Sequence, residues 1–144
     1  MNPIEIHRVA LEEIIDLRHL VLRAGLGREA AYFSGDDHAD TVHLAAKSNG
    51  RVIGSATILL NEYEGHPACQ LRGMAVDFAH QKTGLGRRLL LEIENIAREK
   101  KVGLVWANCR TPAVPFYRKN GWVTVSEEFE IPTAGPHFRM IRRL

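Results

Sequence analysis

The sequence predicts a single α/β domain, and three observations lead to this prediction. The chain has 144 residues, which fits one domain and is long enough to bury about two thirds of its unfolded surface. Strand-like and helical apolar runs follow one another in the order β, α, α, β, β, β, α, β, α, β, β. The sequence contains no internal repeat, linker or low-complexity segment. We therefore expect one domain over residues 1–144.

The N-terminal part of the chain predicts a strand, a helix and a loop. Residues 4–9 alternate in polarity as a strand does, and residues 10–22 place apolar side chains at helical spacing. Glycine and aspartate are frequent in residues 25–40, where their turn preferences predict a loop. A short helix is expected near residues 28–33 within this loop.

Three strands are predicted in the middle of the chain. Residues 41–47 and 52–60 form the first two, and Asn49-Gly50 between them is a strong signal for a hairpin turn. Residues 61–67 predict a turn that leads to the third strand, residues 70–76.

Residues 71–88 join this third strand to a glycine-containing turn that opens an amphipathic helix. The first N–H groups of a helix lack intrahelical partners and the helix dipole adds partial positive charge, so anions bind there. Gly84 and Gly86 carry no side chain that would keep a phosphate from the main chain, while Lys82 and Arg87 add positive charge. The segment therefore predicts a pyrophosphate site.

Two other phosphate loops fail to match this segment. A P-loop requires Gly-Lys followed by Ser or Thr, which is absent, and a dinucleotide fingerprint requires a third glycine where the chain has Leu89. The pattern Gln81-x-x-Gly84-x-Gly86 resembles the coenzyme A loop of the GNAT N-acetyltransferase superfamily. The resemblance implies acetyl-CoA, as acyl donor, at Met74, Ala75, Val76, Gln81, Lys82, Thr83, Gly84, Leu85, Gly86, Arg87, Asn108 and Tyr117.

The flanking segments carry the same resemblance. Residues 102–107 predict a buried parallel strand after a crossover helix. Residues 108–122 resemble the family's second motif, an Asn at the strand end and a short helix that carries Phe-Tyr and closes on Gly and an aromatic residue. Residues 122–131 and 137–143 predict two more strands, which pair antiparallel. The resemblance implies a GNAT-like α/β fold, whose mixed, mostly antiparallel central sheet is flanked by helices on both faces.

In the family that this chain resembles, an amine attacks the thioester directly. The resemblance implies Tyr117 as the general acid for the leaving thiolate, a role that suits a phenol of pKa about 10. A backbone N–H near Ala75 or Val76, where the family has a bulge, would stabilise the oxyanion. Asn108 would contact the cofactor arm, although a strand-end Asn can instead cap the next turn.

His137 is the second catalytic candidate, as the general base. Gly135-Pro136-His137 resembles the C-terminal strand of one small, single-domain branch of the superfamily, and an imidazole titrates near neutral pH. A structural role is the alternative for one histidine among seven. Glu62 and Glu64 are further candidates for the base by their position before the third strand.

The resemblance implies an N-acetyltransferase (EC 2.3.1.-) that moves acetyl to a primary amine of a small molecule or peptide. A catalytically silent acyl-CoA binding module that senses the cofactor or regulates a partner is the alternative, against which Tyr117 counts. A phosphate- or nucleotide-binding domain of another kind is a third possibility. Arg18, Arg23 and Arg28 can bind an acidic acceptor, but arginines on an amphipathic helix usually face solvent, so the acceptor stays open.

Composition limits the partners. The net charge is +2 with both signs mixed, which demands neither nucleic acid nor an anionic membrane. Cys69 and Cys109 lack metal or redox spacing, so we expect buried reduced thiols and no metal. No segment has the length of a membrane span or a signal core, so we expect a cytoplasmic protein. A homodimer through the C-terminal strands is open, because a final strand leaves an edge to cover.

Overall fold

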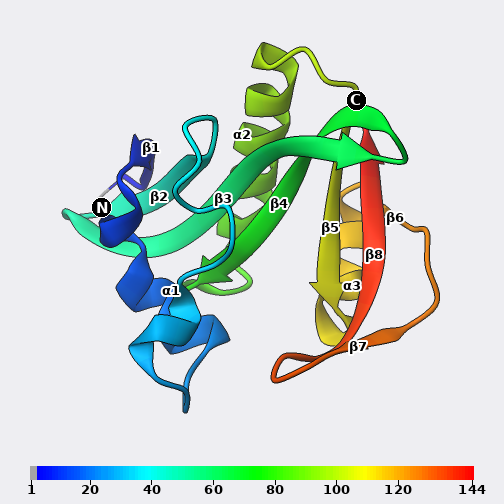
Figure 1. Cartoon of the computed structure of the whole chain (residues 1–144). Helices are drawn as coiled ribbons and strands as arrows, with labels where there is room; N and C mark the ends of the chain where they lie inside the picture. The colour runs from blue at the N-terminus through cyan, green and yellow to red at the C-terminus, as the bar shows by residue number, and fades with distance from the viewer. Residues whose placement is uncertain (1–2) are drawn as a thin grey trace. The chain divides into compact units, whose positions relative to one another are not determined.

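The computed structural model describes residues 3–144, which divide into two compact units. The first unit contains the chain up to Leu59 together with Leu71–Ile93, and the second contains Leu60–Gln70 and Glu94–Leu144. Figure 1 shows the elements of both units, coloured from blue at the N-terminus to red at the C-terminus. Whether residues 1–144 form one domain stays a prediction.

The elements follow one another in nearly the predicted order. They are β1 (Glu5–Val9), η1 (Leu11–Glu13), α1 (Ile15–Leu22), η2 (Arg28–Ala31), β2 (Val42–Ser48), β3 (Arg51–Tyr63), β4 (His66–Val76), η3 (Phe78–His80), α2 (Leu85–Glu99), β5 (Leu104–Arg110), η4 (Thr111–Ala113), α3 (Val114–Lys119), β6 (Val123–Thr124), β7 (Phe129–Ile131) and β8 (Gly135–Arg143). The η elements are short 3₁₀ helices. No helix of the described chain is long and apolar enough to span a membrane.

The strands of the first unit lie in the order β1-β2-β3-β4. Strand β1 pairs antiparallel with β2, and β2 pairs antiparallel with β3. Asn49 and Gly50 join β2 to β3 with φ values of 54° and 75°. Positive φ at both turn residues is what a two-residue hairpin requires, so the predicted turn is confirmed.

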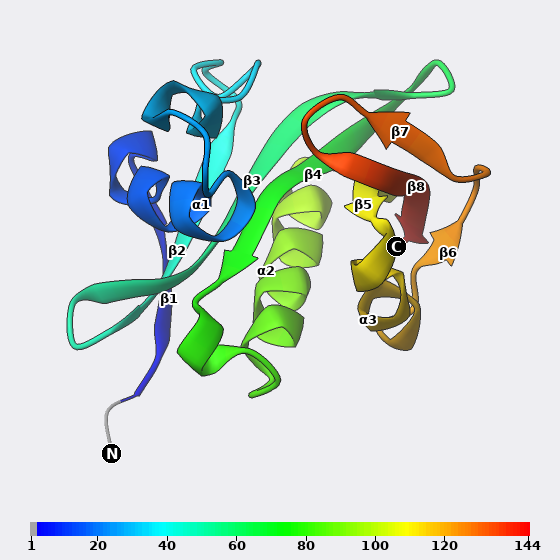
Figure 2. The same cartoon turned by 90° about the horizontal axis from the view of Figure 1, so that it is seen from below.

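Helix α2 covers one face of strand β3 and helix α1 covers the other. A Cβ at Gly54 would lie 3.2 Å from Leu85 and 3.3 Å from Leu89, so α2 packs closely on this glycine. Three residues further on, Thr57 accepts a hydrogen bond of 2.6 Å from Arg18 of α1. Side chains alternate along a strand, so positions 54 and 57 face opposite ways and helices cover both faces, as Figure 2 shows. The predicted flanking helices are confirmed.

The second unit contains the parallel part of the sheet. Strand β4 pairs parallel with β5 at Cys69↔Val105 and Gln70↔Trp106. Strand β5 then pairs antiparallel with β8 along its whole length, and β6 and β7 pair antiparallel with β8. A mixed, mostly antiparallel sheet and a parallel strand after the crossover helix were both predicted, and both are confirmed.

Two predicted boundaries in the long hairpin were wrong. The turn predicted over residues 61–67 is much shorter, because β3 continues to Tyr63 and β4 begins at His66. Glu64 and Gly65 make the turn with φ values of 50° and 80°. The ends of these strands are largely exposed and polar, so they lack the apolar alternation that marks a half-buried strand.

Two other segments are interrupted where the prediction had them continuous. The helix predicted over residues 10–22 breaks at Ile14, whose φ and ψ are −106° and −7°, into η1 and α1. The strand predicted over residues 122–131 is divided into β6 and β7. Between them Ser126 accepts a hydrogen bond from the Arg139 N–H through its side-chain oxygen at 2.8 Å, which replaces a backbone acceptor of the ladder.

The last strand does not lie at an edge of the second unit. Strand β8 runs between β5 and β6. The argument that a final strand leaves an open edge was therefore wrong for β8, and a homodimer stays a prediction without that support.

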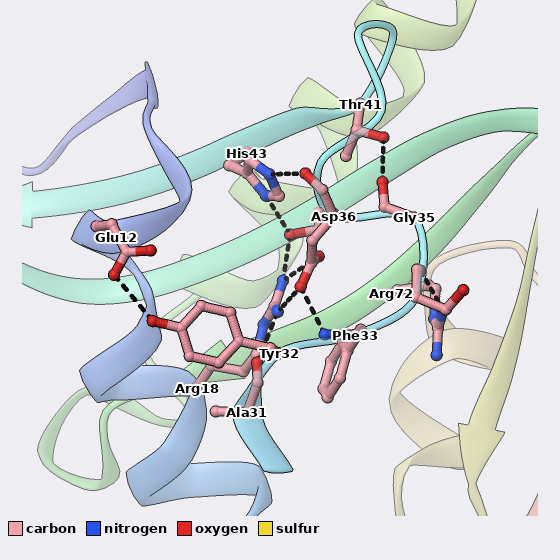
Figure 3. Close-up of polar contacts among 12 residues, drawn as sticks. Glu12, Arg18, Ala31, Tyr32, Phe33, Gly35, Asp36, Thr41, His43 and Arg72 are labelled. Atoms are coloured by element: carbon pink, nitrogen blue, oxygen red, sulfur yellow. Dashed lines mark hydrogen bonds and ion pairs between the residues drawn. The ribbon is translucent and has the colours of Figure 1, made fainter. Parts of the chain in front are cut away.

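Arg18 is fully buried and forms the polar centre of the first unit. Its guanidinium donates to both Asp36 carboxylate oxygens at 2.7 and 3.2 Å, to the Ala31 carbonyl at 2.8 Å and to Thr57 at 2.6 Å. His43 extends the network, because its ring nitrogens lie 2.8 Å from the Thr57 hydroxyl and 3.0 Å from the Asp36 carbonyl. Figure 3 shows that these contacts join the helix, the loop and the sheet.

Removal of Arg18 alone should destabilise the protein more than removal of the buried pair. In Arg18→Met, the Asp36 carboxylate stays buried without its partner, and we expect a loss of about 3–5 kcal/mol in the free energy of unfolding. The double variant Arg18→Met/Asp36→Leu leaves neither charge and should recover a large part of this loss. Urea unfolding followed by circular dichroism measures both. A double variant as unstable as the single one would contradict the prediction.

Candidate functional site

The loop between β4 and α2 is closed by its own polar groups. Asp77, directly after β4, donates its N–H to the Ile53 carbonyl at 2.8 Å and so holds the end of β4 to β3. The side-chain amide of Gln81 donates to the Val76 carbonyl at 3.1 Å. Gln81, which was predicted to bind the cofactor, therefore ties the middle of the loop to the last residue of β4.

The helix N-terminus after this loop is open. Lys82 and Gly84 have φ values of 62° and 88°, and a Cβ at Gly84 would meet no atom within 4 Å. The first hydrogen bond of α2 runs from the Arg88 N–H to the Gly84 carbonyl at 3.2 Å. The N–H groups of Leu85, Gly86 and Arg87 precede this bond and have no acceptor within the helix. They can donate to an anion.

The side chains around this N-terminus have different environments. Lys82 and Arg87 are exposed, whereas Leu85 is buried against Gly54, so Leu85 can meet a ligand through its backbone alone. Thr83 donates its hydroxyl to the His80 carbonyl inside the loop. The arrangement supplies backbone donors and two exposed positive charges, which fits a pyrophosphate group.

Strand β4 is irregular just before Met74, Ala75 and Val76. Gly73 has φ 63°, a left-handed conformation that interrupts a regular strand and that glycine adopts without strain. A bulge near Ala75 or Val76 stays a prediction. Ala75 is buried, while Met74 and Val76 are partly exposed.

The second unit fixes Tyr117 through the end of α3. The Trp122 N–H donates to the Tyr117 carbonyl and the Gly121 N–H donates to the Arg118 carbonyl, each at 3.0 Å. This is a Schellman motif with Gly121 at φ 91°. The Tyr117 and Trp122 rings meet edge to face, with centroids 5.3 Å apart. The Tyr-x-x-x-Gly-Trp spacing of the sequence thus sets the position of the Tyr117 ring.

Burial raises the pKa of the Tyr117 phenol far above its ordinary value, and the neighbouring Cys109 thiol adds to this shift. Burial also raises the pKa of Cys109, to about 12. Both groups are therefore neutral at physiological pH. A neutral phenol is the form that can donate a proton.

Asn108 has a different environment from the one predicted. It lies inside β5, which ends at Arg110, so its placement at a strand end was wrong. Arg139 of β8, which pairs directly with Asn108, donates to its side-chain oxygen at 3.1 Å. No side chain caps the turn η4 that follows Arg110, so the capping alternative is also wrong. Contact of Asn108 with the cofactor stays a prediction.

Sequence spacing missed a row of polar side chains on this sheet. Arg139 stacks on Trp106 at 4.8 Å, the Trp106 indole donates to Asn61 at 3.0 Å, and Asn61 donates to Gln70 at 2.8 Å. The row draws on four strands. Only the sheet register brings these positions together, so no local pattern could have indicated them.

His137 lies near the start of β8 and is buried. Its Nδ1 is 2.8 Å from the Gly135 carbonyl oxygen. Because a carbonyl only accepts, Nδ1 carries the proton of the neutral ring and Nε2 keeps its lone pair. The Phe129 ring of β7 packs beside it with centroids 6.2 Å apart.

Glu62 and Glu64, the other candidates for the base, are exposed. Within residues 3–144, no group of three His, Cys, Asp or Glu side chains could hold a metal.

Comparison with known proteins identifies this architecture. The model of the acetyltransferase (GNAT) family matches residues 10–122. The N-acetyltransferase YitI of Bacillus subtilis strain 168 is 29% identical over 147 residues, which cover 98% of this chain and 97% of YitI.

Solved structures share the fold. Escherichia coli ElaA superposes with a TM-score of 0.79 at 18% identity, with 99% of this chain and 100% of that chain covered. A GNAT family acetyltransferase from Elizabethkingia anophelis, solved with acetyl-CoA bound, gives a TM-score of 0.74 at 18% identity and covers 98% of both chains. At this identity the likeness shows the fold alone.

Both cysteines should be inert in the folded protein. Cys69 and Cys109 are free and buried, and burial raises the pKa of each thiol. At about pH 8.5 an ordinary thiol is about half ionised, whereas Cys109 with its raised pKa stays in the thiol form. A chromogenic thiol reagent should therefore label the protein only as it unfolds. Labelling of the native protein as fast as in denaturant would contradict this expectation.

Proposed function

Because the chain belongs to the acetyltransferase (GNAT) family, we propose that it transfers acetyl from acetyl-CoA to a primary amine of a small molecule or peptide. The amine attacks the thioester directly, without a covalent enzyme intermediate. The observation that carries the proposal is the N-terminus of α2, where the backbone N–H groups of residues 85–87 precede the first intrahelical bond and the left-handed Gly84 has open space at its Cβ position, beside the exposed Lys82 and Arg87.

The pyrophosphate of acetyl-CoA is assigned to this N-terminus. Backbone donors and the helix dipole stabilise its negative charge, and Lys82 and Arg87 add long-range attraction. Gln81 and Thr83 keep the loop in shape through their bonds to Val76 and His80. Met74, Ala75 and Val76 are assigned to the thioester end, where a backbone N–H stabilises the oxyanion.

Tyr117 is assigned to the leaving sulfur. Burial keeps its phenol protonated, and the same burial disfavours a free phenolate. We therefore expect Tyr117 to donate a hydrogen bond that strengthens as the thiolate forms, with proton transfer late in the step. Asn108 is assigned to the cofactor arm.

His137 is assigned as the base that removes a proton from the acceptor ammonium. Its Nδ1–H is held by Gly135, which leaves Nε2 as the basic atom. With this role we also propose that the chain belongs to the small branch that carries Gly-Pro-His in its last strand. The cytoplasmic location and the homodimer stay predictions.

The first experiment is calorimetric titration with acetyl-CoA and, separately, ATP. Acetyl-CoA should bind, and ATP at the same concentrations should not bind with comparable affinity. Gly84→Val adds both strain and a side chain at the phosphate position and should weaken acetyl-CoA binding roughly tenfold or more, since charge-assisted hydrogen bonds contribute about 1.5–3 kcal/mol each. Gly50→Val is the matched control, because Gly50 also has positive φ with no atom within 4 Å of its Cβ position. Equal affinity for ATP would favour a general nucleotide site.

The two proposed catalytic side chains are tested with conservative variants. Tyr117→Phe keeps the ring packing on Trp122 and should lower kcat by about 10²–10⁴-fold at unchanged acetyl-CoA affinity. His137→Gln should also lower kcat by about 10²–10⁴-fold at unchanged acetyl-CoA affinity. Tyr63→Phe, which removes a hydroxyl elsewhere in the second unit, is the control. If wild type binds acetyl-CoA fully but releases no coenzyme A with any amine, the silent acyl-CoA binding module is favoured. If kcat is unchanged in Tyr117→Phe, Tyr117 is not the general acid.

A further inference from the structure

We propose that the acetyl acceptor is an amine that carries a carboxylate, and that Arg72 binds this carboxylate beside Phe33. The inference rests on the proposed function, since it names the class of acceptor for the same reaction. It starts from the side chains that gather around Phe33, two residues after η2 ends.

Three guanidinium groups surround the Phe33 ring. The guanidinium carbons of Arg18, Arg23 and Arg72 lie 4.2, 4.8 and 5.2 Å from the ring centroid. They come from α1, from the residue that ends α1 and from β4, and Figure 3 shows Arg18, Phe33 and Arg72 in this arrangement. Cation–π attraction offsets part of the repulsion between like charges. Helix α1 with its C-terminal cap and strand β4 thus bring three positive charges to one ring.

The buried carboxylate in this network is committed to one of these arginines. Asp36 directs both carboxylate oxygens to Arg18. Arg72 donates instead to a neutral acceptor, the Ser34 carbonyl at 2.8 Å, and this is the one hydrogen bond of the Arg72 side chain to any described residue. Burial lowers the pKa of Arg72 below its ordinary value, Asp36 opposes this shift and the charge of Arg18 adds to it. A bound anion would compensate the charge of Arg72.

The cluster also contains a donor that the protein leaves unsatisfied. Arg18 Nε is buried and has no acceptor at hydrogen-bond distance among residues 3–144. It lies against the backbone of β4, since a Cβ at Gly73 would be 2.9 Å from Arg18 Nε and 2.9 Å from a Phe33 ring carbon. The positive potential of the cluster is therefore directed at the irregular part of β4, next to Arg72.

The position of the cluster matches the proposed reaction. Arg72 precedes Ala75 by three residues, a separation of at most about 10 Å. An amine near Ala75 and a carboxylate at Arg72 can therefore belong to one molecule of amino-acid or short-peptide size. The planar donor pair of a guanidinium matches a carboxylate, whereas a phosphate dianion would keep further oxygens that need donors.

Matched acceptor pairs test the inference. Glycine, β-alanine and phenylalanine are each compared with their amides, and phosphoethanolamine with ethanolamine, by the release of coenzyme A at saturating acetyl-CoA. We expect kcat/KM to be at least roughly tenfold higher for the acid in one or more of the amino-acid pairs, as charge-assisted pairing predicts. Arg72→Gln should remove this preference and leave the amide within about twofold. Arg72→Lys, which keeps the charge without the planar fork, should recover part of it.

Lys47→Gln is the control variant. Lys47 is a partly exposed cation of the same unit that pairs with Glu13 at 2.7 Å, and its removal should not change the preference for acids. Thermal unfolding of each variant separates lost recognition from lost folding. An amide acetylated as well as its acid, or an acid preference that survives Arg72→Gln, would overturn the inference. Preference for phosphoethanolamine with no acid preferred over its amide would assign a phosphate in place of the carboxylate.

Acetyl-CoA titration distinguishes the two possible failures. If acetyl-CoA binds and none of the carboxylate-bearing amines is acetylated, the acceptor inference is wrong while the cofactor assignment stands. If acetyl-CoA does not bind, the proposed function itself is wrong, and the acceptor inference falls with it.

Discussion

The fully buried guanidinium of Arg18 is the interaction on which the first unit depends. A charge removed from water must be paired and hydrogen-bonded, because desolvation costs several kcal/mol per ion. Arg18 meets this requirement by drawing the Asp36 carboxylate, the Ala31 carbonyl and Thr57 around it. The loop between η2 and β2 is thereby held to the sheet. Phe33 is fixed in the same step, since the Phe33 N–H donates to Asp36 at 2.6 Å.

Glycines set the other important positions. Gly54 lets the first turns of α2 pack closely on β3, because a side chain at this position would meet Leu85 and Leu89. Gly84 has the left-handed conformation that leads the chain into α2. Gly121 has the left-handed conformation that ends α3, the helix that carries Tyr117. In each case the absence of a side chain allows a backbone arrangement that exposes or orients a functional group. The proposed chemistry thus depends on backbone conformation as much as on side-chain identity.

The accuracy of the sequence predictions followed the range of the interactions involved. Helix α2, the Asn49-Gly50 turn and the short helix with Tyr117 depend on neighbours within a few residues, and each was predicted. The turn over residues 61–67 and the strand over residues 122–131 were wrong, because exposed polar strands are held by pairing with distant partners. Asn108 was placed at a strand end for the same reason, since pairing with β8 extends β5.

The sequence by itself determined the family pattern, the glycine loop before α2 and the spacing from Tyr117 to Trp122, because each of these is a local backbone requirement written in consecutive residues. Only the tertiary structure decided that Arg18 is buried rather than exposed, that Gln81 closes its own loop and that Arg72 joins Arg23 at Phe33. The first and the third outcome depend on contacts between segments distant in the chain, whereas Gln81 bonds to a residue only five positions before it. Helical periodicity alone cannot separate an arginine that faces solvent from one that serves as the polar centre of a unit.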